Sequence, residues 1–204
     1  VKAGGYLVLT THADQGLSAS STVDLESGSF FDLSNRPQTI AGLTGSGTVY
    51  SHGGSAGHLT VDIAADTTST FAGNLGGGSA SFALTKTGDG TQVLSGANTY
   101  SGNTIVSAGT LHFNTPSSLY GGTIDVTNAD KISVADGATL SLGVGTGSSF
   151  SSSNIATIAV NSTFDAGSKL ALNTAQATGG IATLSDLSSG TVNLQKTGTG
   201  TLKL

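Results

Sequence analysis

The chain of 204 residues has no cysteine, methionine or tryptophan, and only 9 % of its residues are charged. Without cysteine it can form neither disulfides nor thiolate metal sites. Its seven lysines and arginines and its net charge of −5 argue against a nucleic-acid surface, which needs a dense basic patch. No apolar run approaches the roughly 18–20 residues that cross a bilayer. Strong helix formers do not dominate, so long helices are not expected.

The chain has instead 31 glycines and many serines and threonines between short groups of aliphatic residues. Apolar residues alternate with small polar ones, which is the period of a strand with one buried face. Glycine, asparagine or aspartate punctuates most of these runs and favours turns. We therefore expect an all-β protein of short strands, including one at 155–160, where β-branched residues dominate. Other alternating runs occupy 59–63, 132–134, 139–142, 169–172 and 201–204.

Short strands in series could build a sandwich, a barrel or a β-solenoid. The solenoid is favoured because most strands offer only one or two apolar side chains, which suits a thin core lined by stacked coils. Pairing between successive coils would also satisfy the backbone along the axis. With coils of roughly 20–25 residues, the chain would make about nine turns in a rod on the order of 45 Å long. We expect it to be a fragment of a longer rod.

The sequence also repeats itself over a long interval. The stretch from Leu84 to Thr91 returns 110 residues later, from Leu194 to Thr201, as Leu-x-Lys-Thr-Gly-x-Gly-Thr. Residues 1–4, Val-Lys-Ala-Gly, are similar to residues 106–109, Val-Ser-Ala-Gly. Internal repeats are expected where each structural unit contacts mainly its neighbours, as in a solenoid.

Residues 82–113 carry a pattern much longer than strand alternation. From Leu84 to Leu111 they read Leu-x-Lys-x-Gly-x-Gly-x-x-x-Leu-x-Gly-x-Asn-x-Tyr-x-Gly-x-Thr-x-Val-x-x-Gly-x-Leu. This segment resembles the passenger-associated transport repeat of bacterial autotransporters, also called the autotransporter-associated β-strand repeat. Its structural positions are Leu84, Lys86, Gly88, Gly90, Leu94, Gly96, Asn98, Tyr100, Gly102, Thr104, Val106, Gly109 and Leu111.

The resemblance implies a right-handed parallel β-helix that is exported through the outer membrane by a C-terminal translocator barrel of the parent chain. It implies a place on the bacterial cell surface or outside the cell, and a repeat that aids secretion and folding. The absence of cysteine suits passage through an oxidising compartment. We expect residues 1–204 to form a single β-helical passenger segment, with the repeat core at 82–113 and partial copies at 1–9 and 194–204.

The residues of the repeat have separate expected roles. Gly88 and Gly90 allow the backbone to turn with positive φ on either side of Asp89. Asn98 suits a turn or a ladder, because asparagine tolerates the left-handed region and its amide can stack between coils. Tyr100 is expected to cover a coil edge. The core is expected to take Leu84, Val93 and Leu94, and further corners to take Gly102 and Gly109.

Few residues outside the repeat suggest chemistry. His52 and His58 are six residues apart in a glycine-rich stretch, a spacing that suits no metal pair on one strand or helix. His112 alternates with Leu111 and Phe113, so it is expected to point outward. The sequence predicts no catalytic, cofactor-binding or metal-binding residue.

One acidic group keeps an enzymatic alternative open. Asp24, Glu26 and Asp32 would alternate on one strand face, and Arg36 follows them. β-Helices that cleave polysaccharides use paired acids with a basic residue. A solvated polar face is the preferred interpretation, and a carbohydrate-active enzyme carried on the β-helix is the alternative.

We expect a non-enzymatic, surface-displayed or secreted rod segment that serves as a stalk or adhesive scaffold. Its threonine-, serine- and asparagine-rich faces could bind protein or glycan surface molecules of a host or of bacteria, or a second copy of the chain. Nucleic acid is not an expected partner, and no cofactor is expected. A further alternative is a toxin or host-receptor-binding module that uses loops at 51–58 and 143–153.

Overall fold

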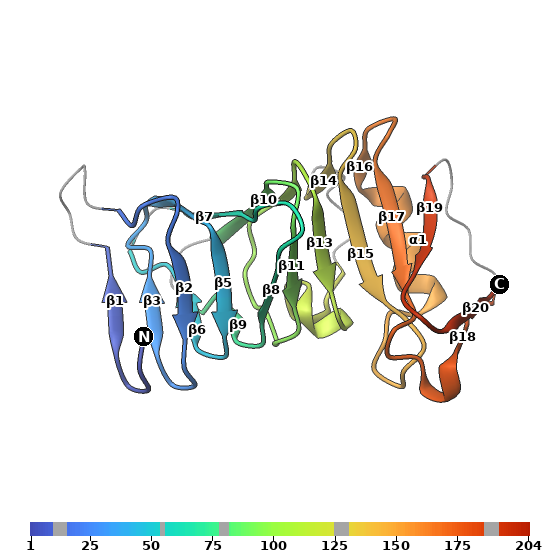
Figure 1. The fold of residues 1–204 in the computed structure, drawn as a ribbon, viewed down its shortest axis with the longest axis horizontal. Helices are drawn as coiled ribbons and strands as arrows, with labels where there is room; N and C mark the ends of the chain where they lie inside the picture. The colour runs from blue at the N-terminus through green and yellow to red at the C-terminus, as the bar shows by residue number, and fades with distance from the viewer. Residues whose placement is uncertain (10–15, 54–55, 78–81, 125–130, 186–191) are drawn as a thin grey trace.

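The computed structural model describes residues 1–9, 16–53, 56–77, 82–124, 131–185 and 192–204. Its strands pair in parallel, and consecutive strands of the chain lie in different sheets. The coils therefore stack along the long axis, and the two termini lie near opposite ends of the molecule (Figure 1). The predicted parallel β-helix is confirmed.

The described strands form three stacked sheets and a terminal pair. The long sheet contains β2 (Thr22–Leu25), β5 (Gly42–Gly45), β8 (Thr68–Phe71), β11 (Thr91–Leu94), β13 (Thr110–Phe113), β15 (Thr139–Gly143), β17 (Lys169–Asn173) and β19 (Leu194–Thr197). The second sheet contains β4 (Pro37–Ile40), β7 (Gly57–Asp62), β10 (Phe82–Thr87), β12 (Thr104–Val106), β14 (Ile132–Val134) and β16 (Thr163–Phe164). The third sheet contains β1 (Tyr6–Val8), β3 (Phe30–Asp32), β6 (Thr48–Tyr50) and β9 (Asn74–Leu75), and the pair is β18 (Ile181–Thr183) with β20 (Thr201–Lys203).

The cross-section of the rod changes at the repeat. From β4 to β9 the chain visits the second, long and third sheets in turn, so each coil has three faces. After β11 the described chain adds no strand to the third sheet. In later coils, helices stand between the long-sheet strand and the next strand of the second sheet, where a third-sheet strand would be. These are η1 (Pro116–Ser118), η2 (Tyr120–Gly122) and α1 (Ser152–Asn161), while η3 (Thr178–Gly180) precedes β18.

The coils differ in length more than the sequence predicted. Partners in the long sheet are as close as 19 residues in the chain, between Thr91 and Thr110. They are as far apart as 30 residues, between Thr139 and Lys169. The long sheet counts eight turns in the described part of the chain, against the expected nine or so. The longer coils are those that contain the helices, which take up more residues per turn of the rod than a strand does.

Several corners between strands share one tight geometry. The N–H of the fourth corner residue donates to the carbonyl of the first, and the third residue lies in the left-handed region. Glycine adopts that region without a steric penalty, and aspartate tolerates it. The third residues of these corners are Gly4, Gly28, Asp66 and Gly137, with φ between 60° and 78°.

The helix α1 corrects one expectation. Residues 155–160 were expected to form a strand, but Ile155, Ile158 and Ala159 are buried at helical spacing. The Ser151 side chain accepts a hydrogen bond from the Asn154 N–H, and Asn154 Oδ1 accepts one from the Ser151 N–H. This reciprocal cap starts a helix, and the burial of one apolar face outweighs the strand propensity of the β-branched residues.

Candidate functional site

The residues of the repeat lie on four consecutive strands, β10 to β13, and in the corners between them, in the middle of the rod. Leu84 in β10 and Val106 in β12 point into the core from the second sheet. Leu94 in β11 and Leu111 in β13 do so from the long sheet. Each of the four side chains is at most 1 % exposed, so the aliphatic positions of the pattern line the interior of two successive coils.

The lysine of the repeat is buried in the same interior. Lys86 is 0 % exposed, and its Nζ donates to the carbonyls of Thr87 at 2.6 Å and Gly88 at 2.7 Å. A third carbonyl, that of Ala108 in the next coil, lies 3.4 Å away. Burial lowers the pKa of Lys86 to about 8, although the carboxylates of Asp62 and Asp89 oppose the shift. The ammonium therefore ties the corner after β10 to the coil that follows.

Asn98 joins the coils on either side of its own. Its Oδ1 accepts a hydrogen bond from the Leu75 N–H at 2.9 Å in the preceding coil. Its Nδ2 donates to the Ser118 carbonyl at 2.6 Å in the following coil. The side chain is fully buried, so both backbone groups depend on it for a partner.

Gln92 is a third polar tie, which the sequence interpretation missed. It is fully buried, and its Nε2 donates to the carbonyls of Leu43 at 3.0 Å and Ser69 at 3.2 Å, in the two preceding coils. Val93, which was expected in the core, instead lies on the outer face and is half-buried. Leu94 enters the core as expected, and because side chains alternate along a strand, Gln92 shares its inner face and Val93 must point outward. We call Lys86, Gln92 and Asn98 together the repeat clamp.

The glycines of the repeat allow close approach between coils. Gly88 has a φ of 68°, as expected, but Gly90 is not in the left-handed region. A Cβ on Gly90 would instead collide with the Ala64 and Thr67 carbonyls of the preceding coil. Side chains at Gly96, Gly102 and Gly109 would likewise run into backbone carbonyls of a neighbouring coil.

Tyr100 and Thr104 complete the repeat with a hydroxyl chain. Tyr100 was expected at a coil edge, yet it is 2 % exposed and its hydroxyl lies 2.7 Å from Thr104 Oγ1. Thr104 Oγ1 also lies 2.7 Å from the hydroxyl of Tyr120 one coil on. The Tyr100 ring is 4.9 Å from that of Tyr120 and 6.0 Å from that of Phe82. Burial raises the pKa of both tyrosines, so they remain neutral donors and acceptors at physiological pH.

The acidic group singled out by the sequence is dispersed. Asp24 lies in β2 of the long sheet and Asp32 in β3 of the third sheet, so the expected single strand face is wrong. Glu26 sits at the corner between them and pairs with Lys2 at 2.6 Å. Arg36 lies between β3 and β4. The chain turns after Leu25, and that corner sends the later acid to another face of the coil.

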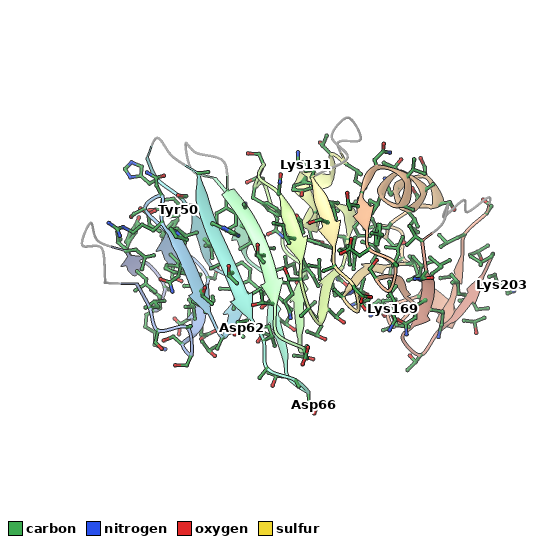
Figure 2. All side chains as sticks on the ribbon, turned by 90° about the horizontal axis from the view of Figure 1, so that it is seen from above. Tyr50, Asp62, Asp66, Lys131, Lys169 and Lys203 are labelled. Carbon is green, nitrogen blue, oxygen red and sulfur yellow. The ribbon has the colours of Figure 1, made fainter. Side chains whose placement is uncertain are left out.

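Other charged groups are also spread along the rod. Figure 2 shows Asp62 and Asp66 on one side, with Asp66 at a protruding corner, and Lys131 on the opposite side. Lys169 and Lys203 lie further along, toward the C-terminal end (Figure 2). The described residues include no cluster of three histidines, cysteines, aspartates or glutamates that could hold a metal ion.

Of the four histidines, His12 lies outside the described residues, and the other three take separate positions. Nε2 of His58 in β7 lies 2.7 Å from Thr85 Oγ1, and His52 is exposed. His112 lies on the outer face of the long sheet, but it is only 8 % exposed because it sits in a hollow. Its Nδ1 is 2.9 Å from Ser141 Oγ, and burial lowers its pKa.

The two loops that were considered as contact sites, 51–58 and 143–153, are described by the structure to different extents. Residues 54–55 of the loop at 51–58 lie outside the described part of the chain. The stretch 143–153 is not a free loop, because Gly143 ends β15 and Ser151 caps α1. Phe150 between them is 1 % exposed and anchors the connection to the core.

Comparison with known proteins finds one family match, in the middle of the chain. No curated protein and no solved structure matches the chain. In the part of the chain that the structure describes, no helix is long and apolar enough to span a membrane. The family model of the passenger-associated-transport-repeat matches residues 84–113, a range that includes all thirteen predicted repeat positions. Residues 84–113 therefore match the family of the passenger-associated transport repeat, and this segment lies in a parallel β-helix.

Proposed function

We propose that the chain is a rod segment of a surface-displayed or secreted autotransporter passenger, and that its repeat fastens neighbouring coils and so aids folding and secretion. The repeat clamp carries this proposal. Its three buried polar side chains bond to backbone groups from Leu43 to Ser118, both before and after the repeat. A generic coil needs only its strand hydrogen bonds and core to stack, whereas the clamp adds specific ties over several coils.

The clamp suits folding that proceeds coil by coil. Few charges and no disulfides let an extended chain pass through a translocator. Outside the cell, each new strand can pair with the exposed edge of the previous coil. Once the repeat docks, Asn98 and Gln92 bond to backbone groups of neighbouring coils, and the Lys86 ammonium reaches the Ala108 carbonyl of the next coil. Local reopening would therefore leave buried polar groups unpaired. Such locking would oppose backward sliding of the chain.

A non-catalytic role as stalk or scaffold agrees with the placement of the acids. Asp24 Oδ1 accepts a hydrogen bond from Thr44 Oγ1 at 2.8 Å. Asp32 Oδ1 accepts from the N–H groups of Ser34 and His52. These carboxylates are engaged in local structure on different sheets, and we propose that they hold the shape of the rod.

The proposal is tested by surface display of three variants in the bacterium. Asn98→Leu removes the amide but keeps the branched arrangement of the side-chain heavy atoms, Leu111→Ser removes core, and Ser101→Ala changes an exposed position of the same repeat. We expect the first two variants to reach the surface several-fold more slowly than wild type, because docking of the repeat is weakened. Ser101→Ala is expected to match wild type. The fraction of chain accessible to protease on intact cells, followed over time, measures display.

Equal display kinetics for all three variants, with a confirmed loss of folding stability in the first two, would reject a role of the repeat in secretion. A loss of display with Ser101→Ala as large as with Asn98→Leu would also contradict it.

A further inference from the structure

The outer face of the long sheet carries a hollow that lies outside the core of the rod. It lies over β11, β13, β15 and β17, is bordered by β8 and β19, and holds about 450 Å³. A smaller hollow of about 210 Å³ adjoins it, because Val93, His112 and Asn173 line both. We call the two together the sheet groove.

Strand register arranges the side chains of the sheet groove in rows. Thr91 pairs with Thr110 and Thr110 with Thr139, which makes a row of hydroxyls along the rod. In the next row, Ser141 pairs with Ala171. These two are only 3 % and 1 % exposed, although they face away from the core, because larger side chains stand around them. Small residues in the floor therefore create the depth.

The sheet groove is polar but uncharged. None of the residues that line its two hollows carries a formal charge, within the part of the chain that the structure describes. His112 in the floor is bonded to Ser141, and its lowered pKa keeps the ring neutral at neutral pH. Side-chain amides at Asn114, Asn173, Gln176 and Gln195 add donors and acceptors, and apolar contact comes from Val93, Val144, Ala171 and Ala175.

We propose that the sheet groove binds a neutral oligosaccharide. Hydroxyls and amides both donate and accept hydrogen bonds, as sugar hydroxyls do, and the more exposed Val93 and Ala175 can contact the C–H face of a sugar ring. Lys169 pairs with Thr139 at the end of the hydroxyl row but does not line either hollow, so an anionic glycan or acidic peptide would find no cation among the lining residues. An apolar ligand would leave the polar lining without partners. The strands are about 4.8 Å apart, close to the length of one hexose unit, so a linear chain can meet the same groups repeatedly.

The test compares two leucine substitutions in the same outer row of the sheet. Ala171→Leu fills the floor of the groove, whereas Thr70→Leu, on β8, lies outside it. Binding to the chain is measured with neutral hexasaccharides of glucose, mannose and N-acetylglucosamine, and with anionic oligogalacturonate. We expect at least one neutral probe to bind, and Ala171→Leu to weaken binding by about tenfold or more. Thr70→Leu and added salt are expected to leave binding unchanged, because no ion pair is involved.

Several outcomes would overturn the proposal. These are no binding of any neutral probe, preference for oligogalacturonate, equal loss with Thr70→Leu, or undiminished binding by a folded Ala171→Leu chain. If circular dichroism shows that Ala171→Leu does not fold, Gln195→Ala replaces it, and unchanged binding by that variant rejects the assignment. Capture of a protein with no neutral glycan bound would also reject it. These results are independent of the display assay, so the binding proposal can fail while the role in secretion stands.

Discussion

At the scale of single residues, the thin core is held by polar as well as apolar side chains. Lys86, Gln92 and Asn98 are each fully buried, and each bonds to backbone groups outside its own coil. The lysine is the most unusual of the three, because an ammonium loses its hydration on burial. Its carbonyl partners compensate only partly, since its pKa falls from 10.5 to about 8.

The lowered pKa of Lys86 predicts a pH dependence of stability. Below about pH 8 the amine is protonated in both the folded and unfolded chain, and the folded chain bears the full burial penalty. Between about pH 8 and 10.5 the unfolded chain binds more protons, so stability rises with pH. Over this range we expect the free energy of unfolding of wild type to rise by up to about 3 kcal/mol relative to that of Lys86→Met. Urea unfolding at several pH values measures this difference.

The variant comparison removes other contributions at high pH. Burial raises the pKa of Tyr100 and Tyr120, so their titration lowers stability as the pH rises. This effect is present in both wild type and Lys86→Met and cancels in the difference. A difference between wild type and Lys86→Met that stays constant from pH 7 to 10.5 would contradict the assigned burial of the ammonium.

At the scale of elements, α1 shows how packing and capping decide a short apolar segment. The run 155–160 fits a strand by composition, and the structure makes it a helix. Two signals in the sequence favour the helix: the serine cap three residues before Asn154, and apolar residues at Ile155, Ile158 and Ala159. The spacing of the buried residues was a better guide than their β-branching.

Loss of the cap of α1 is expected to weaken this part of the rod. Ser151→Ala removes the acceptor for the Asn154 N–H and should lower the free energy of unfolding by about 1 kcal/mol. Ser153→Ala, at an exposed position inside the helix, is the matched control and should stay within about 0.5 kcal/mol. Chemical denaturation of both variants checks this, and equal effects would show that the cap contributes nothing.

At the scale of the whole molecule, the rod shape depends on close contacts between the backbones of successive coils at their corners. Gly90 faces carbonyls of the preceding coil, and Gly109 in turn faces the Gly88 and Gly90 carbonyls. One column of close contacts therefore runs through three successive coils around the repeat. No side chain fits in that column, since even a methyl group would push neighbouring coils apart.

A methyl group at this column should destabilise the rod more than one elsewhere. Gly90→Ala is expected to cost more than about 2 kcal/mol, because the neighbouring atoms are backbone and cannot rotate away. Gly147→Ala, which meets open space at an exposed position, should be neutral or stabilising by up to about 1 kcal/mol. Thermal unfolding of the two variants compares them, and similar melting temperatures would refute the stacking argument.

The sequence by itself determined the parallel β-helix and the transport repeat. Alternation of small polar and aliphatic residues predicts short strands, and the resemblance carried by the fixed positions from Leu84 to Leu111 favours the parallel β-helix among the folds that such strands can build. Such features depend on neighbours only a few residues away, so they can be recognised without a structure.

Tertiary structure alone decided which faces those residues occupy. Gln92 and not Val93 enters the core, and Asp24 and Asp32 separate onto different sheets. His112 lies in the sheet groove beside Ser141, 29 residues later in the chain. For Gln92 and His112 the partner lies one or more coils away, and variable coil lengths hide that register from the sequence. The two acids are separated by the corner after Leu25, whose position the alternation of residues does not give.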